Sequence, residues 1–147
     1  MQWIYQSRID RFLEPQRTSY AIAFEEVRNG RQVSHWMWYI FPQLRGLGQS
    51  NVAWYYGIED LSEAKAYLKH PILGLRLREI TQAALDLSET DPMKVFGWPD
   101  NMKFRSCMTL FAQISEDDLF ARALEKFFAG QEDSMTLELL KRKGKAL

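Results

Sequence analysis

Residues 71–87 read PILGLRLREITQAALDL, and their pattern decides the fold class. The apolar positions alternate spacings of four and three residues: Leu73, Leu77, Ile80, Ala84 and Leu87. That is the period of one face of an α-helix that packs against a core. Pro71 stands just before the stripe, where a proline suits the start of a helix because its missing N–H has no partner there. The stretch predicts a long amphipathic helix.

Similar stripes lie on both sides of this helix in the sequence. They comprise Tyr20, Phe24 and Val27; then Phe104, Cys107, Met108, Phe111 and Ile114; then Leu119, Phe120, Ala123, Leu124, Phe127 and Phe128. Because each stripe needs a partner to bury it, the helices should share one hydrophobic core. We expect that core to contain Leu77, Ile80, Phe104, Met108, Phe111, Leu124 and Phe127.

Polar residues and helix breakers mark the expected helix ends. Pro15 is expected to end a first turn, and Thr18 to cap the helix that follows. Asp60 with Glu63 three residues later resembles a capping box. Asp100 is expected to cap the helix that carries the Phe104 stripe. Together, the stripes and caps predict an all-α protein of about six to eight helices.

The bulk composition limits the classes of function. A length of 147 residues suits one compact domain over residues 1–147, and 19 basic residues balance 19 acidic ones. A neutral total gives no overall field that would attract nucleic acid, so we expect no nucleic-acid partner. A single cysteine, Cys107, favours the reducing cytoplasm. No apolar run approaches the roughly 20 residues of a membrane span, so no membrane partner is expected either.

Residues 35–43, HWMWYIFPQ, form the least helical part of the chain and the candidate site. With Pro42 and the turn sequence Gly46-Leu47-Gly48 close behind, the segment should be partly irregular. Trp36 and Trp38 are two residues apart and cannot share a helical face, so one of them should point toward solvent or a cleft. An exposed indole is a stacking surface for a flat ring.

The candidate site residues divide by their chemistry. His35 and Asp100 are the candidates for proton transfer. Trp36 and Trp38 could stack on a ring of the ligand, and Gln43 could donate or accept hydrogen bonds. Lys103 and Arg105 could bind its anionic groups. Each group also has a structural alternative. His35 would lie at a helix end with its ring nitrogens bonded to the backbone, the rings would pack in the core, and the polar residues would form the solvated start of a helix. No metal-ligand spacing occurs, so no metal or cofactor is expected.

The chain also resembles a known bacterial family, domain of unknown function 1810, whose members are sometimes labelled calpastatin-like. The matching residues are 35–43 with 46–48, Ala64 to Leu68 with His70-Pro71, Leu73-Gly74 with Arg76-Leu77, Phe96-Gly97 with Pro99-Asp100, Lys103, and Ser106 to Phe111. They extend from about Arg11 to Leu140. The resemblance implies a single, mostly helical domain of no established activity.

A fainter resemblance is to helical domains that process ADP-ribose and related N-glycosidic metabolites, in helix order and in a Lys/Arg-rich middle. We therefore expect a domain that binds a small molecule, either without catalysis or as an enzyme acting on a nucleotide-like or ADP-ribose-type ligand. The alternative is a protein-interaction module that uses the aromatic segment 35–43. A deep pocket with convergent polar groups would favour the first function, and a flat apolar patch the second.

Overall fold

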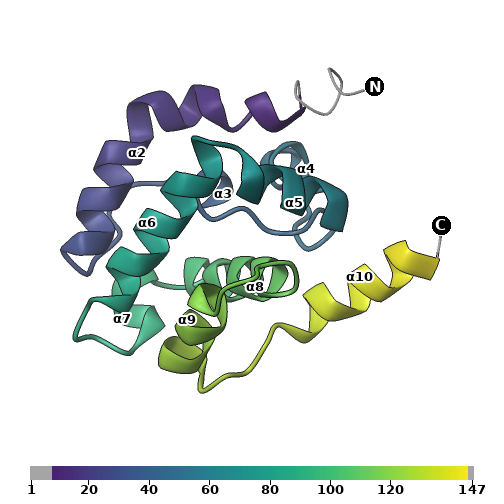
Figure 1. The fold of residues 1–147 in the computed structure, drawn as a ribbon. Helices are drawn as coiled ribbons and strands as arrows, with labels where there is room; N and C mark the ends of the chain where they lie inside the picture. The colour runs from purple at the N-terminus through teal and green to yellow at the C-terminus, as the bar shows by residue number, and fades with distance from the viewer. Residues whose placement is uncertain (1–7, 146–147) are drawn as a thin grey trace.

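The structure is a computed structural model that describes residues 8–145 (Figure 1). Within these residues, six helices have nine residues or more: α2 (Leu13–Arg28), α5 (Leu61–Lys69), α6 (Leu73–Leu85), α8 (Asp100–Ala112), α9 (Leu119–Phe128) and α10 (Ser134–Lys145). Three have four or five: α3 (Met37–Ile40), α4 (Asn51–Tyr55) and α7 (Pro92–Phe96). The described chain forms no strand, so the predicted all-α fold is confirmed.

Helices α6 and α8 lie at the centre of the domain. Helix α6 contacts α2, α5 and α9, and helix α8 contacts α3, α5, α7, α9 and α10. Figure 1 shows α2 beside α6, with α8 and α9 beneath them and α10 extending away from the other helices. All seven residues expected in the core are at most 5% exposed, which confirms that the stripes share one core.

The centre of this core is aromatic. The Phe104 ring lies 5.0 Å from Phe41, 4.4 Å from Phe96 and 5.6 Å from Phe127, measured between ring centroids. These three partners come from the segment after α3, from α7 and from α9, so one ring of α8 joins three parts of the chain. Aromatic pairs at such distances contribute about 0.5–1.5 kcal/mol each beyond their buried area.

The observed helix ends agree only in part with those predicted from the sequence. Asp60 caps α5, since its carboxylate accepts from the N–H of Glu63 at 2.9 Å, as predicted. The prediction that Pro15 ends a turn and Thr18 caps the next helix is wrong: α2 runs through both residues. Pro15 is tolerated because it lies in the first turn, where its missing N–H would have no partner. Asp100 is not a cap, because it is the first residue of α8 and Pro99 precedes it at the N-cap position.

A buried ion pair fixes the chain before α2 against α5. The guanidinium of Arg11 lies 2.8 Å from the carboxylate of Glu63, with side chains only 7% and 1% exposed. Arg11 also donates to the carbonyls of Tyr55 at 2.7 Å and Gly57 at 2.8 Å, and Glu63 accepts from the N–H of Glu59 at 2.9 Å. The pair is therefore hydrogen-bonded on both sides, which a buried pair needs to offset its desolvation.

Helices α5 and α6 meet at a point where only glycine fits. A Cβ atom on Gly74 would lie 2.0 Å from the carbonyl oxygen of Leu68, near the end of α5. The turn between the helices is held by His70, whose Nδ1 accepts from the N–H groups of Ile72 at 3.1 Å and Leu73 at 3.2 Å. Any larger side chain at position 74 would force the two helices apart.

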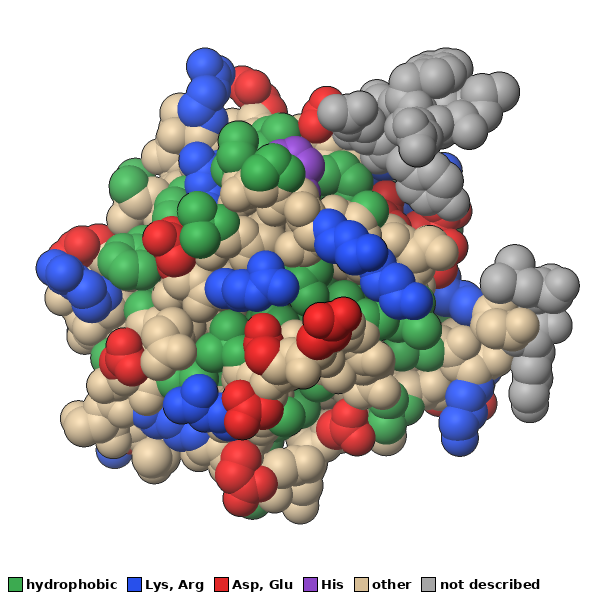
Figure 2. All heavy atoms as spheres, viewed as in Figure 1, with side chains coloured by type: hydrophobic (Ala, Val, Ile, Leu, Met, Phe, Trp, Pro, Cys, Tyr) green, Lys and Arg blue, Asp and Glu red, His purple; other side chains and the backbone are tan. Residues whose placement is uncertain are grey.

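Basic and acidic side chains are interspersed over the visible face of the molecule (Figure 2). Within residues 8–145 no helix is long and apolar enough to cross a membrane.

Candidate functional site

The start of the aromatic segment is anchored by one carboxylate of α2. Glu26 accepts hydrogen bonds from the N–H groups of Val33 at 2.8 Å and Ser34 at 2.9 Å, from the Ser34 hydroxyl at 2.7 Å and from the indole N–H of Trp36 at 2.8 Å. Burial on its own would raise the pKa of Glu26, but these four donors outweigh it and lower the pKa to about 2. Nothing in the spacing of Glu26 indicated this role, since its partners lie seven to ten residues away.

The two tryptophans of the segment have different surroundings. Trp36 is 1% exposed and packs near Phe41, with ring centroids 6.1 Å apart. Trp38, in α3, is only partly buried. The expectation that one of the two points outward is therefore met by Trp38. The prediction that Trp36 binds a ligand is wrong, because its ring lies in the core and has no free face.

Lys103 joins the aromatic segment to the start of α8. Its ammonium lies 4.1 Å from the ring centroid of Trp38, within the range of a cation–π interaction. The same ammonium donates to Asp100 at 3.0 Å, and the second oxygen of Asp100 accepts from the Gln32 amide at 2.9 Å. Three of the predicted residues, Trp38, Asp100 and Lys103, thus form one connected group across 65 residues of sequence.

Gln43 lies at the edge of this group. A Cβ atom built on Gly48 would lie 3.5 Å from the Trp38 ring and 3.6 Å from the Gln43 amide nitrogen, so that ring and amide flank the Gly46–Gly48 turn. Gln43 is 7% exposed, its side chain makes no hydrogen bond with the described residues, and its polar atoms are not among the fully buried ones that lack a partner.

Two further amides near the start of α8 were not among the predicted residues. The side-chain oxygens of Gln32 and Asn101 are buried and have no partner in the described part of the chain. Gln32 reaches the site through Asp100, and Asn101 follows Asp100 in α8. No sequence pattern marks either residue, because an amide carries no charge and sits on no apolar stripe.

The other two predicted residues lie apart from this group. His35 is exposed and has no hydrogen bond from its ring to any described residue. Arg105 turns toward the connection between α9 and α10, where it donates to the carbonyls of Gln131 at 2.9 Å and Glu132 at 3.0 Å. Its guanidinium also lies 5.6 Å from the Phe128 ring centroid. Arg105 therefore holds a loop rather than lying beside Lys103.

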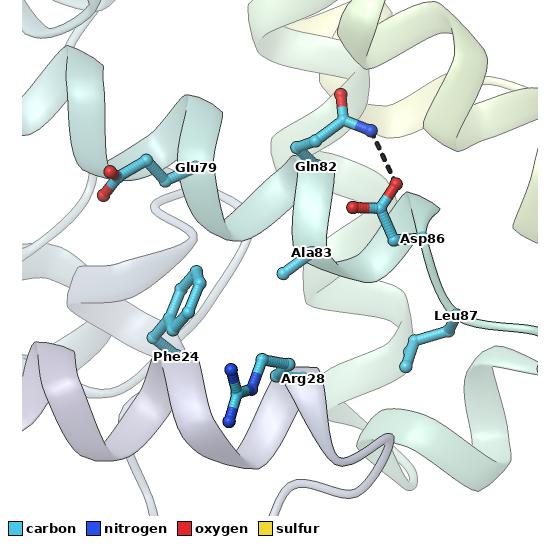
Figure 3. A pocket seen from close by; sticks show the side chains of 7 residues that line it. All are labelled: Phe24, Arg28, Glu79, Gln82, Ala83, Asp86 and Leu87. Atoms are coloured by element: carbon cyan, nitrogen blue, oxygen red, sulfur yellow. Dashed lines mark hydrogen bonds between the residues drawn. The ribbon is translucent and has the colours of Figure 1, made fainter.

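Three pockets lie elsewhere on the described surface. One, of about 410 Å³, is bounded by Phe24 and Arg28 of α2 and by α6 with Leu87 (Figure 3). Its polar groups are already paired: Asp86 accepts from Gln82 at 2.8 Å, and Arg28 bonds Glu25 at 2.7 Å. The other two are bounded by Lys65, Leu68, Lys69, Arg78, Ile114, Glu116 and Asp117, and by Glu59, Asp60, Leu61, Ser62, Leu140, Lys143 and Gly144.

No group of three or more His, Cys, Asp or Glu side chains that could hold a metal ion occurs within residues 8–145. Cys107 is fully buried in α8, and burial raises the pKa of its thiol, which makes the thiolate a poor candidate for a nucleophile.

Comparison with known proteins places the chain in a family. No curated protein matches it. The crystal structure of the conserved hypothetical protein Rv1873 from Mycobacterium tuberculosis is similar in sequence and fold, with 44% identity and a TM-score of 0.88. The match covers 90% of this chain and 96% of that one. A family model described as a protein of unknown function, DUF1810, matches residues 6–140. The chain therefore belongs to the DUF1810 family.

Proposed function

We propose that this protein binds a small molecule that carries a flat ring and an anionic group, as a nucleotide or an ADP-ribose derivative does. The binding surface would comprise Trp38, Gln43, Asp100 and Lys103. The observation that carries the proposal is the ammonium of Lys103, held 4.1 Å from the partly exposed Trp38 ring and 3.0 Å from Asp100. A stacking surface and a fixed positive charge thus lie within a few ångströms of each other.

The amides beside this group support the same class of ligand. Gln43 and Asn101 are each 7% exposed, and neither side chain hydrogen-bonds to a described residue. Amide groups pair with the donors and acceptors on the edges of a base or on sugar hydroxyls. If the domain is also an enzyme, Asp100 is the carboxylate placed for proton transfer, because it lies directly beside Lys103.

Burial of the rings argues against the alternative of a peptide-docking module. Trp36, Met37, Ile40 and Phe41 are at most 2% exposed, so most of the aromatic segment presents no apolar surface to a partner. A docking interface would need a contiguous apolar patch at its centre.

The test is a thermal-shift screen with nucleotides and ADP-ribose derivatives, followed by calorimetric titration of any compound that raises the melting temperature. A ligand at 100 times its Kd stabilises the folded state by about 2.7 kcal/mol, which corresponds to roughly 5–10 °C for a chain of this size. Lys103→Met should weaken binding at least tenfold, while Lys94→Met on α7 serves as the matched control because Lys94 is exposed and its side chain forms no hydrogen bond or ion pair with the described residues.

Two results would overturn the proposal. One is a screen in which no ring-bearing anion shifts the melting temperature. The other is a Lys103→Met protein that binds the compound as tightly as the parent does. A fall of several degrees in the melting temperature of the unliganded Lys103→Met protein would show that Lys103 is structural, and would also count against a binding role.

A further inference from the structure

A second pocket carries an excess of positive charge that the proposed site does not use. It lies between α5, α6 and the connection from α8 to α9, and has a volume of about 420 Å³. Lys65 and Lys69 of α5 and Arg78 of α6 line it, together with Glu116 and Asp117 of the connection. We call it the α5–α6 pocket. Figure 2 shows basic side chains over α5 and α6 facing acidic ones over that connection, with hydrophobic surface between them.

The two lysines have no partners that explain their position. They are exposed, lie four residues apart on α5, and form no ion pair with the described residues. Like charges at this spacing destabilise a helix by about 0.2–0.5 kcal/mol. Lys69 lies in the last turn, where the helix dipole favours a cation, but Lys65 lies a full turn earlier. The dipole therefore explains a cation at Lys69 but gives no reason for one at Lys65.

Two other charged groups of the pocket, Arg78 and Asp117, already have hydrogen-bond and ion-pair partners. Arg78 donates to the carbonyl of Leu68 at 3.2 Å and lies 3.8 Å from Asp117. Asp117 in turn accepts from the N–H of Leu119 at 3.0 Å and from the hydroxyl of Ser115 at 3.1 Å, at the start of α9. Arg78 and Asp117 thus offset each other, and the two lysines outnumber the remaining carboxylate, Glu116, so the charge left over on the pocket wall is positive by one unit.

Apolar side chains complete the lining. Leu68 is 6% exposed and Ile114 is partly buried, so each presents some surface to the pocket. An apolar floor with a cationic rim is complementary to a molecule that has an apolar body and an anionic head. The pocket beside α2 differs, because its lining has one cation, Arg28, against two carboxylates, Glu79 and Asp86, so its excess charge is negative.

We propose that the α5–α6 pocket binds a small amphipathic anion, with its carboxylate or phosphate between Lys65 and Lys69 and its apolar chain against Leu68 and Ile114. This site is separate from the one around Trp38. The proposal therefore does not depend on the function proposed above.

Titration of the full chain with octanoate, octyl phosphate and the neutral octanol tests this inference. We expect at least one of the anions to bind ten times more tightly than octanol, and the stronger of the two identifies the preferred head group. Amide resonances of α5, α6 and residues 114–117 should shift in two-dimensional NMR spectra. Binding should weaken as salt rises, because the lysines are exposed to solvent.

Variants separate this site from the proposed one. Replacing both lysines, Lys65→Gln with Lys69→Gln, should weaken anion binding at least tenfold and leave the melting temperature within about 2 °C, since both side chains are exposed. Lys94→Gln is the matched control, and Lys103→Met should leave octanoate binding unchanged. The inference is overturned if octanol binds as well as the anions, if no anion binds, if the double variant binds as the parent does, or if the shifted resonances lie elsewhere.

Discussion

Replacing Arg11 with methionine should cost about 3–5 kcal/mol of unfolding free energy. The structure gives the reason: the carboxylate of Glu63 is 1% exposed and loses the guanidinium that lies 2.8 Å from it. A buried charge left without its partner costs this amount in comparable cases. The carbonyls of Tyr55 and Gly57 lose their donor as well. For a chain of this length the melting temperature should fall by roughly 6–20 °C.

Urea denaturation followed by far-ultraviolet circular dichroism measures the loss. The double variant, Arg11→Met with Glu63→Leu, should recover most of the loss because it removes the unpaired charge and keeps the volume. A loss below about 1 kcal/mol in the single variant, or a double variant less stable than the single one, would refute the reasoning.

Two further predictions concern the core and the anchor of the aromatic segment. Phe111→Ala should cost about 3–5 kcal/mol in the same urea assay, because the ring is fully buried between Tyr67 and Phe120; a cost below about 1 kcal/mol would contradict its placement. Glu26→Gln should destabilise the protein by about 1–2 kcal/mol at pH 7, after allowance for solvent screening of a partly exposed group. Because the pKa of Glu26 is about 2 in the folded state and ordinarily 4.5, its stabilisation is present above pH 4.5 and is lost toward pH 2. Unfolding curves of parent and variant should therefore converge over that range, and a constant difference would contradict the four hydrogen bonds.

The helices and their buried faces could be predicted because they follow a short period. Leu77, Ile80, Phe104 and Phe111 lie on stripes that each span a single helix, and the structure buries all four. The rule that proline ends a helix gave a wrong prediction at Pro15, because a proline is compatible with the first turn of a helix.

The polar contacts could be predicted only by chemical type. Lys103 and Trp38 were both singled out, but their 4.1 Å contact depends on how α3 packs against α8. Arg105, two residues after Lys103, points elsewhere because a helix turns by about 200° over that interval. Arg11 and Glu63 are 52 residues apart and belong to no motif, so no sequence pattern could have paired them.

The close approach at Gly74 also shapes the α5–α6 pocket. The absence of a side chain at position 74 lets the carbonyl of Leu68 approach α6 closely, since a Cβ atom there would lie 2.0 Å from that oxygen. Leu68 and Arg78 belong to the pocket wall, and the guanidinium of Arg78 binds that same carbonyl. The backbone of this part of the wall is therefore held by the helix contact and by the Arg78 hydrogen bond. A molecule that enters the pocket would order chiefly the exposed side chains of Lys65 and Lys69, and immobilising each of them costs about 0.5–1.5 kcal/mol of the binding free energy.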